Sequence, residues 1–201
     1  MNFTHLRVAS GYSFKYGTAH IADLVKRAAE FGSQSLALTD RDSLAGVIRF
    51  AKECEAYGIA PIIGVNLSLE QKKYRATLLA QPGGLSSLYR LFTALNFQEP
   101  DGVINSKFLA KNSMHLEKLL LLHGPESQLV AAIKANRNSE AYSIFSAYKD
   151  FFGNQAIECV THQRAGDGAF STALAGKSLA FARDKRIPAV ISNAVRMLDR
   201  K

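Results

Sequence analysis

Short apolar segments alternate along this chain with longer segments in which apolar residues recur every three or four positions. The short segments are typical of buried strands, and the longer ones of helices with one apolar face. The expected strands cover residues 3–8, 35–39, 61–65, 74–80, 119–123, 155–160 and 188–192. The expected helices run from an N-cap at Thr18 to Gly32, from an N-cap at Asp42 or Ser43 to near Gly58, and over residues 85–95, 128–135, 139–152 and 169–184.

This alternation predicts an α/β fold, either a sheet or a barrel, with mostly parallel strands and right-handed crossovers. Residues 74–80 are expected to pair with residues 65–69 as a hairpin, and the polar residues 96–113 to form a long loop. In such folds functional groups gather at the C-terminal ends of the strands. The residues that follow the expected strands form a polar set rich in arginine, whereas a metal site would be dominated by His, Asp and Glu.

The composition adds three limits. A net charge of +8 is compatible with a nucleic acid or another polyanion as partner, but the basic residues are spread along the chain. The two cysteines, Cys54 and Cys159, exclude a disulfide framework and fit a reducing compartment, so we expect a cytoplasmic protein. No apolar run approaches the ~18–20 residues of a membrane span, so no membrane is expected as a partner.

Four segments carry a more specific signal. In chain order they are residues 3–13 (FTHLRVASGYS), 36–42 (LALTDRD), 61–64 (PIIG) and 191–193 (ISN). Together they resemble the N-terminal PHP (polymerase and histidinol phosphatase) domain of bacterial DNA polymerase III alpha subunits. The TDRD sequence at residues 39–42 is most similar to the error-prone or accessory branch of these subunits. The resemblance extends from about residue 3 to the C-terminus, so residues 1–201 are expected to form one PHP domain.

The resemblance implies a distorted, seven-stranded (β/α) barrel, here truncated at its C-terminal end. Metal-competent members of the family bind a trinuclear metal cluster at the C-terminal ends of the strands and hydrolyse phosphoesters. Some replicative polymerases use that site for 3′–5′ proofreading.

The positions at which the family carries metal ligands hold other residues in this chain. The resemblance places the family's His-x-His pair on Arg7 and Ala9, and its first aspartate on Tyr16. The remaining family positions fall on Arg41, Asn66, Arg75, Gly124, Ala194 and Arg196. We therefore expect a degenerate site without catalytic residues or metal ligands. The neighbours expected around it are His5, Asp40, Asp42, Glu158 and Asn193.

Arginine occupies four of these positions, and its chemistry opposes metal binding. A guanidinium has no lone pair to give a metal and stays protonated at any working pH, so it repels a divalent cation. Buried arginines need counter-charges, for which Asp40, Asp42 and Glu158 are the nearest acids by motif position. One hypothesis is therefore that salt bridges replace the metal. Another is an anion site, because forked arginine donors suit phosphate or a nucleic-acid backbone.

Two enzyme hypotheses stay open at this point. A residual single-metal site could draw on His5, Asp40, His123 or His162, although these residues lack a short ligand spacing. The chain could also be a metal-dependent phosphoesterase or 3′–5′ exonuclease with unusual ligands.

The length of the chain shapes the expected role. Polymerase III alpha subunits are several times longer, so we expect a fragment of a longer protein whose polymerase activity and Mg²⁺ belong to another domain. The resemblance implies a structural role in DNA replication or translesion synthesis. The implied partners are the polymerase core of the same chain, other replisome subunits and, through the full-length protein, DNA. No cofactor is expected in the 201 residues themselves.

Overall fold

The computed structural model describes residues 3–69, 72–99 and 101–198. The chain divides into two compact units, which we describe separately. Unit 1 comprises residues 1–66 together with residues 192–201, and unit 2 comprises residues 67–191. Unit 1 is therefore discontinuous in sequence, because its last strand is contributed by the C-terminal segment.

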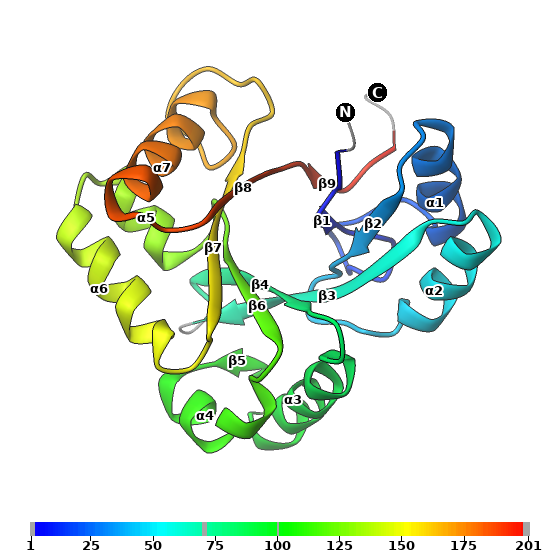
Figure 1. The fold of residues 1–201 in the computed structure, drawn as a ribbon, viewed down its shortest axis with the longest axis horizontal. Coiled ribbons are helices and arrows are strands. Elements are labelled where there is room, and N and C mark those ends of the chain that lie inside the picture. The colour runs from blue at the N-terminus through cyan, green and yellow to red at the C-terminus, as the bar shows by residue number, and fades with distance from the viewer. Residues whose placement is uncertain (1–2, 70–71, 100, 199–201) are drawn as a thin grey trace. The chain divides into compact units, whose positions relative to one another are not determined.

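Unit 1 is built from parallel strands, with two helices between them (Figure 1). Strand β1 pairs in parallel with β9, and β2 pairs in parallel with the start of β3. Strand β1 also contacts β2, because the Ala37 and Thr39 amides donate to the His5 and Val8 carbonyls. The elements are β1 (Arg7–Val8), α1 (Ile21–Glu30), β2 (Ser35–Leu38), α2 (Val47–Ala56), the start of β3 (Ala60–Leu69) and β9 (Ala194–Val195).

Unit 2 contains a mixed sheet in which the end of β3, β4, β6, β7 and β8 follow one another as neighbours. Strand β4 is antiparallel to β6, whereas β6 and β7 are parallel, and β5 pairs in parallel with β3. The neighbouring placement of β3 and β4 confirms the expected pairing of these segments. The elements are β4 (Tyr74–Ala80), α3 (Leu85–Gln98), β5 (Val103–Ile104), α4 (Ser106–Lys111), η1 (Ser113–His115), β6 (Leu119–His123), α5 (Gln128–Lys134), α6 (Asn138–Lys149), β7 (Asn154–Val160), α7 (Thr172–Lys185) and β8 (Ala189–Ser192).

The expected long loop over residues 96–113 is wrong. Helix α3 continues to Gln98, and the segment then forms β5 and α4. The Asn105 side chain caps α4 by accepting a hydrogen bond from the Phe108 amide. Phe108 and Leu109 are buried, so two apolar anchors in a polar segment are enough to fix a short helix.

Two expected N-caps are also wrong. Helix α1 begins after His20, because the Thr18 amide and hydroxyl both donate to the Arg196 carbonyl and hold the chain outside the helix. Helix α2 begins after Gly46, because the Asp42 amide donates to the Asn66 carbonyl. In both places, contacts between distant segments override the local capping preference.

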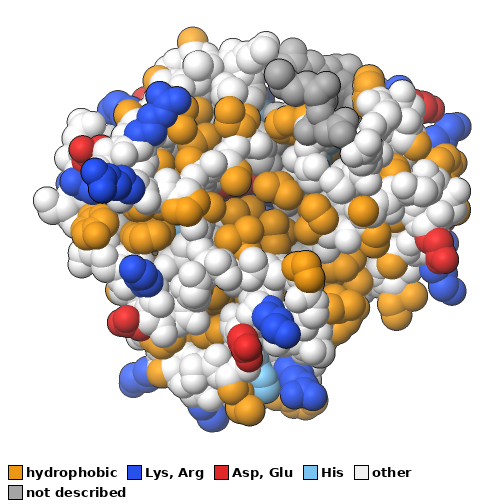
Figure 2. All heavy atoms as spheres, viewed as in Figure 1, with side chains coloured by type: hydrophobic (Ala, Val, Ile, Leu, Met, Phe, Trp, Pro, Cys, Tyr) orange, Lys and Arg blue, Asp and Glu red, His pale blue; other side chains and the backbone are white. Residues whose placement is uncertain are grey.

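Lysine and arginine side chains stand apart from one another over the visible face of the molecule (Figure 2). Several pair with a nearby acid, as Arg137 does with Glu140 at 2.8 Å and Lys185 with Asp184 at 2.9 Å. The positive charge is therefore partly offset locally. Among the described residues, no helix is long and apolar enough to cross a membrane.

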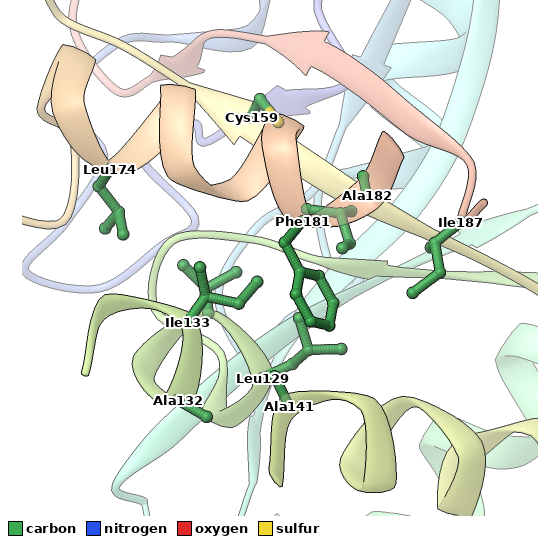
Figure 3. Packing of buried hydrophobic residues seen from close by; sticks show 11 residues of the cluster. Leu129, Ala132, Ile133, Ala141, Cys159, Leu174, Phe181, Ala182 and Ile187 are labelled. Carbon is green, nitrogen blue, oxygen red and sulfur yellow. The ribbon is translucent and has the colours of Figure 1, made fainter. Parts of the chain in front are cut away.

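One apolar cluster of unit 2 joins α5, α6 and α7 to β7. Figure 3 shows Phe181 of α7 pointing toward Leu129 and Ile133 of α5. Burying each such side chain contributes about 1.5–3 kcal/mol. Cys159 belongs to this cluster, and burial, with the nearby Glu158 charge, raises the pKa of its thiol to about 11. Cys159 is therefore a protonated core residue at neutral pH, as Cys54 is for the same principal reason.

Candidate functional site

The carboxyl ends of β9, β1 and β2 lie side by side in unit 1, next to residues 60–66 of β3. Arg7 is opposite Ala194 in the parallel pair β1–β9, and the Ala9 amide donates to the Val195 carbonyl. On the other side of β1, Arg41 bridges in parallel to Asn66 just beyond the end of β2. Because the strands share one direction, the residues that follow them meet at one edge of the unit.

Asp40 is the buried centre of this edge, with a residue exposure of 1%. Its Oδ1 accepts hydrogen bonds from the Ser10 amide and the Ser13 hydroxyl, both at 2.6 Å. Its Oδ2 accepts a hydrogen bond from the Ser10 hydroxyl at 2.9 Å. The carboxylate thus receives three donors from one loop, and charge-assisted bonds of this kind are the stronger ones in proteins.

The loop of residues 9–17 is shaped around Asp40. The Ser13 hydroxyl oxygen also accepts a hydrogen bond from the Arg41 amide at 2.9 Å, which ties the loop to the end of β2. At Gly17, any Cβ would overlap the carbonyl of Ser10, so the close return of the chain requires glycine there. We call the set of Ser10, Ser13 and Asp40 the serine–aspartate lock.

Three of the expected positions form a stacked group beside this lock. The guanidinium carbon of Arg41 lies 3.4 Å from the centroid of the Tyr16 ring. The guanidinium carbon of Arg196 lies 5.3 Å from the same centroid. All three side chains are half-buried. A positive charge over an aromatic face is stabilised by the ring quadrupole, and we call this group the Arg–Tyr–Arg stack.

The other expected residues of unit 1 have varied surroundings. Arg7 is buried at 4% exposure, and the small residues Ala9 and Ala194 are buried on either side of the β1–β9 pair. Asn66 is buried, and its amide donates to the Asp40 carbonyl. Asn193 is exposed.

His5 is the one expected imidazole of unit 1. Its ring lies edge-on against Phe3, and burial lowers its pKa. Among the described residues, no hydrogen-bond partner is found for its Nδ1.

The remaining expected residues belong to unit 2. Arg75 donates from Nη1 to the Ser68 hydroxyl at 2.7 Å, so it joins β4 to the end of β3. The Gly124 carbonyl accepts a hydrogen bond from the Ser127 amide in the turn before α5. Glu158 is buried on β7, and His162 stacks on Phe170 with the ring planes 11° apart.

His123, at the end of β6, is a core residue. Its Nε2 lies 2.8 Å from the Gln155 side-chain oxygen, and its ring contacts those of Phe145 and Tyr148. Burial lowers the pKa of His123 to about 4, against a smaller opposing effect of the Gln155 hydrogen bond. The imidazole is therefore neutral at pH 7 and links β6 and β7 to α6.

The structure thus gathers Arg41, Tyr16 and Arg196 in one place, and adds Ser10 and Ser13, which the sequence analysis did not single out as site residues. Across residues 3–69, 72–99 and 101–198, no three His, Cys, Asp or Glu side chains gather in a group that could hold a metal ion. The available signal for the serines was their position in the SGYS segment at residues 10–13, just after the first strand.

A model of the PHP domain family matches residues 5–162. The chain belongs to the PHP domain family. The fold aligns with that of a solved two-domain protein from Bacteroides vulgatus that contains a predicted PHP-like metal-dependent phosphoesterase. That alignment has a TM-score of 0.62 at 11% identity, and covers 96% of this chain and 52% of the other. The expected α/β fold of PHP type is confirmed.

The chain is similar to one part of longer curated DNA polymerases. An error-prone DNA polymerase of Symbiobacterium thermophilum is 33% identical over 192 residues, which are 87% of this chain and 18% of that protein. The DNA polymerase III subunit alpha of Bacillus subtilis is 32% identical over 176 residues, or 78% of this chain and 16% of the other. The chain therefore spans less than a fifth of these relatives and is homologous to the N-terminal region of such polymerases.

Proposed function

We propose that this PHP domain is a metal-free, non-catalytic module of a DNA polymerase of the polymerase III alpha or error-prone class. In the full-length protein it packs against the polymerase core of the same chain and supports replication or translesion synthesis. Nucleotidyl transfer and its Mg²⁺ belong to that core. The observation that carries this proposal is the Arg–Tyr–Arg stack at three positions where the family resemblance expects metal ligands.

The chemistry of the donors supports this proposal. Guanidinium groups have no lone pair for a metal, and two of them beside one ring repel a divalent cation. The carboxylate next to them, Asp40, already accepts three hydrogen bonds from Ser10 and Ser13. The group therefore does not fit the trinuclear cluster of the metal-competent family members.

Metal content tests the first part of the proposal. Protein expressed with Zn, Mn and Fe supplied, and purified without chelator, is expected to contain far less than one metal per chain by elemental analysis. Asp40→Ala and the exposed control His20→Ala should give the same low value. A stoichiometric metal that is lost in Asp40→Ala and retained in His20→Ala would overturn the metal-free assignment.

Nuclease assays test the second part. A metal-activated water supplies both nucleophile and Lewis acid in metal-dependent phosphoester cleavage, so its loss removes both. The purified domain is expected to leave 3′-labelled single-stranded DNA and a model phosphomonoester intact at the level of a buffer control. Mn²⁺-dependent cleavage that disappears in Asp40→Ala would restore the exonuclease hypothesis.

Deletion from the full-length polymerase tests the structural role. Removal of the domain is expected to lower the melting temperature of the remaining polymerase and to increase its aggregation. Adding the separately purified domain should partly restore the melting temperature. An unchanged melting temperature after deletion would show that the polymerase core does not depend on this module.

A further inference from the structure

The loop of residues 9–17 turns two aromatic side chains toward solvent. Ser13 is buried, with its hydroxyl bound to Asp40, whereas the residues on either side of it are exposed. Tyr12 is 41% exposed and Phe14 is 83% exposed. A single exposed apolar residue is ordinary on a protein surface, but several that are held together in one place mark a site of interaction.

Hydrogen bonds hold this loop in one shape. The Ser13 amide donates to the Ser10 carbonyl, and the Tyr12 amide donates to the Ser10 hydroxyl at 3.2 Å. The Tyr16 and Gly17 amides both donate to the Ser13 carbonyl. Together with the serine–aspartate lock, these contacts preorganise the loop. Exposed rings on a preorganised loop lose little conformational entropy when a partner covers them.

More apolar surface lies near the two rings. A Cβ at Gly46 would lie 2.9 Å from Cδ2 of the Tyr12 ring, so the ring packs directly on the residue that precedes α2. Ile48, in the first turn of α2, is exposed, and so is Met197, which follows Arg196 of the Arg–Tyr–Arg stack. All of these residues belong to unit 1. We call the following set the loop surface: Tyr12, Phe14, Ile48 and Met197.

The chemistry of the loop surface favours a protein partner over a nucleic acid. Tyrosine, phenylalanine and methionine are enriched at protein–protein interfaces. A surface for single-stranded nucleic acid instead combines rings for base stacking with a groove of positive charge. Ile48 and Met197 offer no flat ring to a base. The loop of residues 9–17 has a single cation in its sequence, Lys15, whose Nζ lies 5.3 Å from the centroid of the Phe14 ring.

The proposed function supplies such a partner. The chain aligns with less than a fifth of its polymerase relatives and is homologous to their N-terminal region. In the proposed full-length protein the polymerase core therefore follows this domain, and the connecting segment leaves the domain close to Met197 in sequence. A core that is tethered in this way meets the loop surface at a high effective concentration.

We propose that the loop surface is the docking face for the polymerase core of the same chain, with the Phe14 ring as the central anchor in an apolar pocket of the core. Buried aromatic anchors of this kind carry most of the binding energy of an interface. The inference rests on the proposed function and gives the degenerate edge a task in assembly. Asp40 then supports a docking loop through Ser10 and Ser13.

Cysteine labelling tests this docking face. Phe14→Cys is made in the isolated domain and in the full-length polymerase, and maleimide labelling is followed by mass spectrometry of the peptide that contains residue 14. Labelling is expected to be at least about tenfold slower in the full-length protein, because the centre of an interface excludes water. Cys54 and Cys159 are buried and burial raises their pKa to about 11, so they add little background.

Phe31→Cys is the matched control. Phe31 is also in unit 1 and is 78% exposed, but it lies between α1 and β2, at the edge where the parallel strands begin. Residue 31 should react equally fast in the isolated domain and in the full-length polymerase. Both variants of the isolated domain should melt as the wild type does, because both rings are exposed.

Equal labelling of residue 14 in the two proteins, or equal protection of residues 14 and 31, would overturn the docking face. The proposed function would still stand if deletion of the domain destabilises the polymerase, so the two failures are distinguishable. Two other occupants are tested on the isolated domain. Protection of residue 14 by a single-stranded oligodeoxynucleotide would assign the loop surface to nucleic acid, and protection that grows with protein concentration would assign it to a second copy. Either result would overturn the proposal.

Discussion

The candidate site of unit 1 and the helix cluster of unit 2 differ in chemistry. The candidate site of unit 1 is organised around the buried Asp40 carboxylate, which accepts three hydrogen bonds, and Arg7 on β1 and Asn66 on β3 are also buried. The cluster that joins α5, α6 and α7 to β7 in unit 2 is apolar. Hydrogen bonds are directional, whereas apolar burial is not. The site therefore fixes the positions of particular side chains, and the cluster contributes stability through the amount of apolar surface it buries.

The largest expected effect is a cavity in unit 2. Phe181→Ala removes a buried ring that packs on Leu129 and Ile133, and large-to-small core changes of this kind cost about 3–5 kcal/mol. Urea unfolding followed by circular dichroism measures the free energy of unfolding. Phe97→Ala is the control in the same unit, because Phe97 is 86% exposed and should change stability little. Similar losses for both variants would contradict the assigned role of the cluster.

The second-largest expected effect is a loss of stability at low pH. The pKa of His123 is lowered to about 4 in the folded protein from its ordinary value of 6.5. The unfolded chain then binds the proton more readily, so the stability contribution is complete above pH 6.5 and is lost as the pH falls toward 4. The full loss is about 3 kcal/mol.

Urea unfolding at a series of pH values between these limits measures this loss. His123→Gln is expected to flatten the profile, whereas His115→Gln on the short η1 helix should keep it steep. A steep profile that survives in His123→Gln would assign the acid sensitivity to other groups.

A smaller effect is expected from the serine–aspartate lock. Asp40→Ala leaves the buried donors of Ser10 and Ser13 without their acceptor, which costs about 1–3 kcal/mol. Asp23→Ala, in the exposed first turn of α1, is the control for loss of one carboxylate. The melting temperature should fall in Asp40→Ala and change little in Asp23→Ala. Equal melting temperatures for the two variants would mean that water replaces the carboxylate at no cost.

The sequence predicted the elements best where one apolar pattern decided them. Strands over residues 74–80 and 119–123 match β4 and β6 at both ends, because each contains a continuous run of buried residues, Ala76–Leu79 in β4 and Leu121–His123 in β6. Starts of helices were predicted less well. Thr18 and Asp42 have good capping chemistry, yet their backbone amides donate to Arg196 and Asn66, and these partners are distant in sequence.

The candidate site was predictable in part for a similar reason. Motif order identified Arg41, Asn66 and Arg196, and parallel strand ends explain why they meet. The donors of Asp40 were missed, because Ser10 and Ser13 resemble ordinary turn residues until the loop closes over the carboxylate. The stacking of two arginines on Tyr16 depends on side-chain geometry that no local pattern encodes.

The pairing of β1 with β9 has a consequence for biosynthesis. Arg7 and Ala194 are partners in one ladder, although about 190 residues separate them in the chain. At a ribosomal rate of about 5–20 residues per second, β9 is synthesised roughly 10–40 s after β1. During that time the continuous segment 67–191 is being completed, while one edge of β1 stays open to chaperones or to wrong pairing. The nascent protein can assemble its apolar unit early, but its arginine site only after residue 196 has emerged.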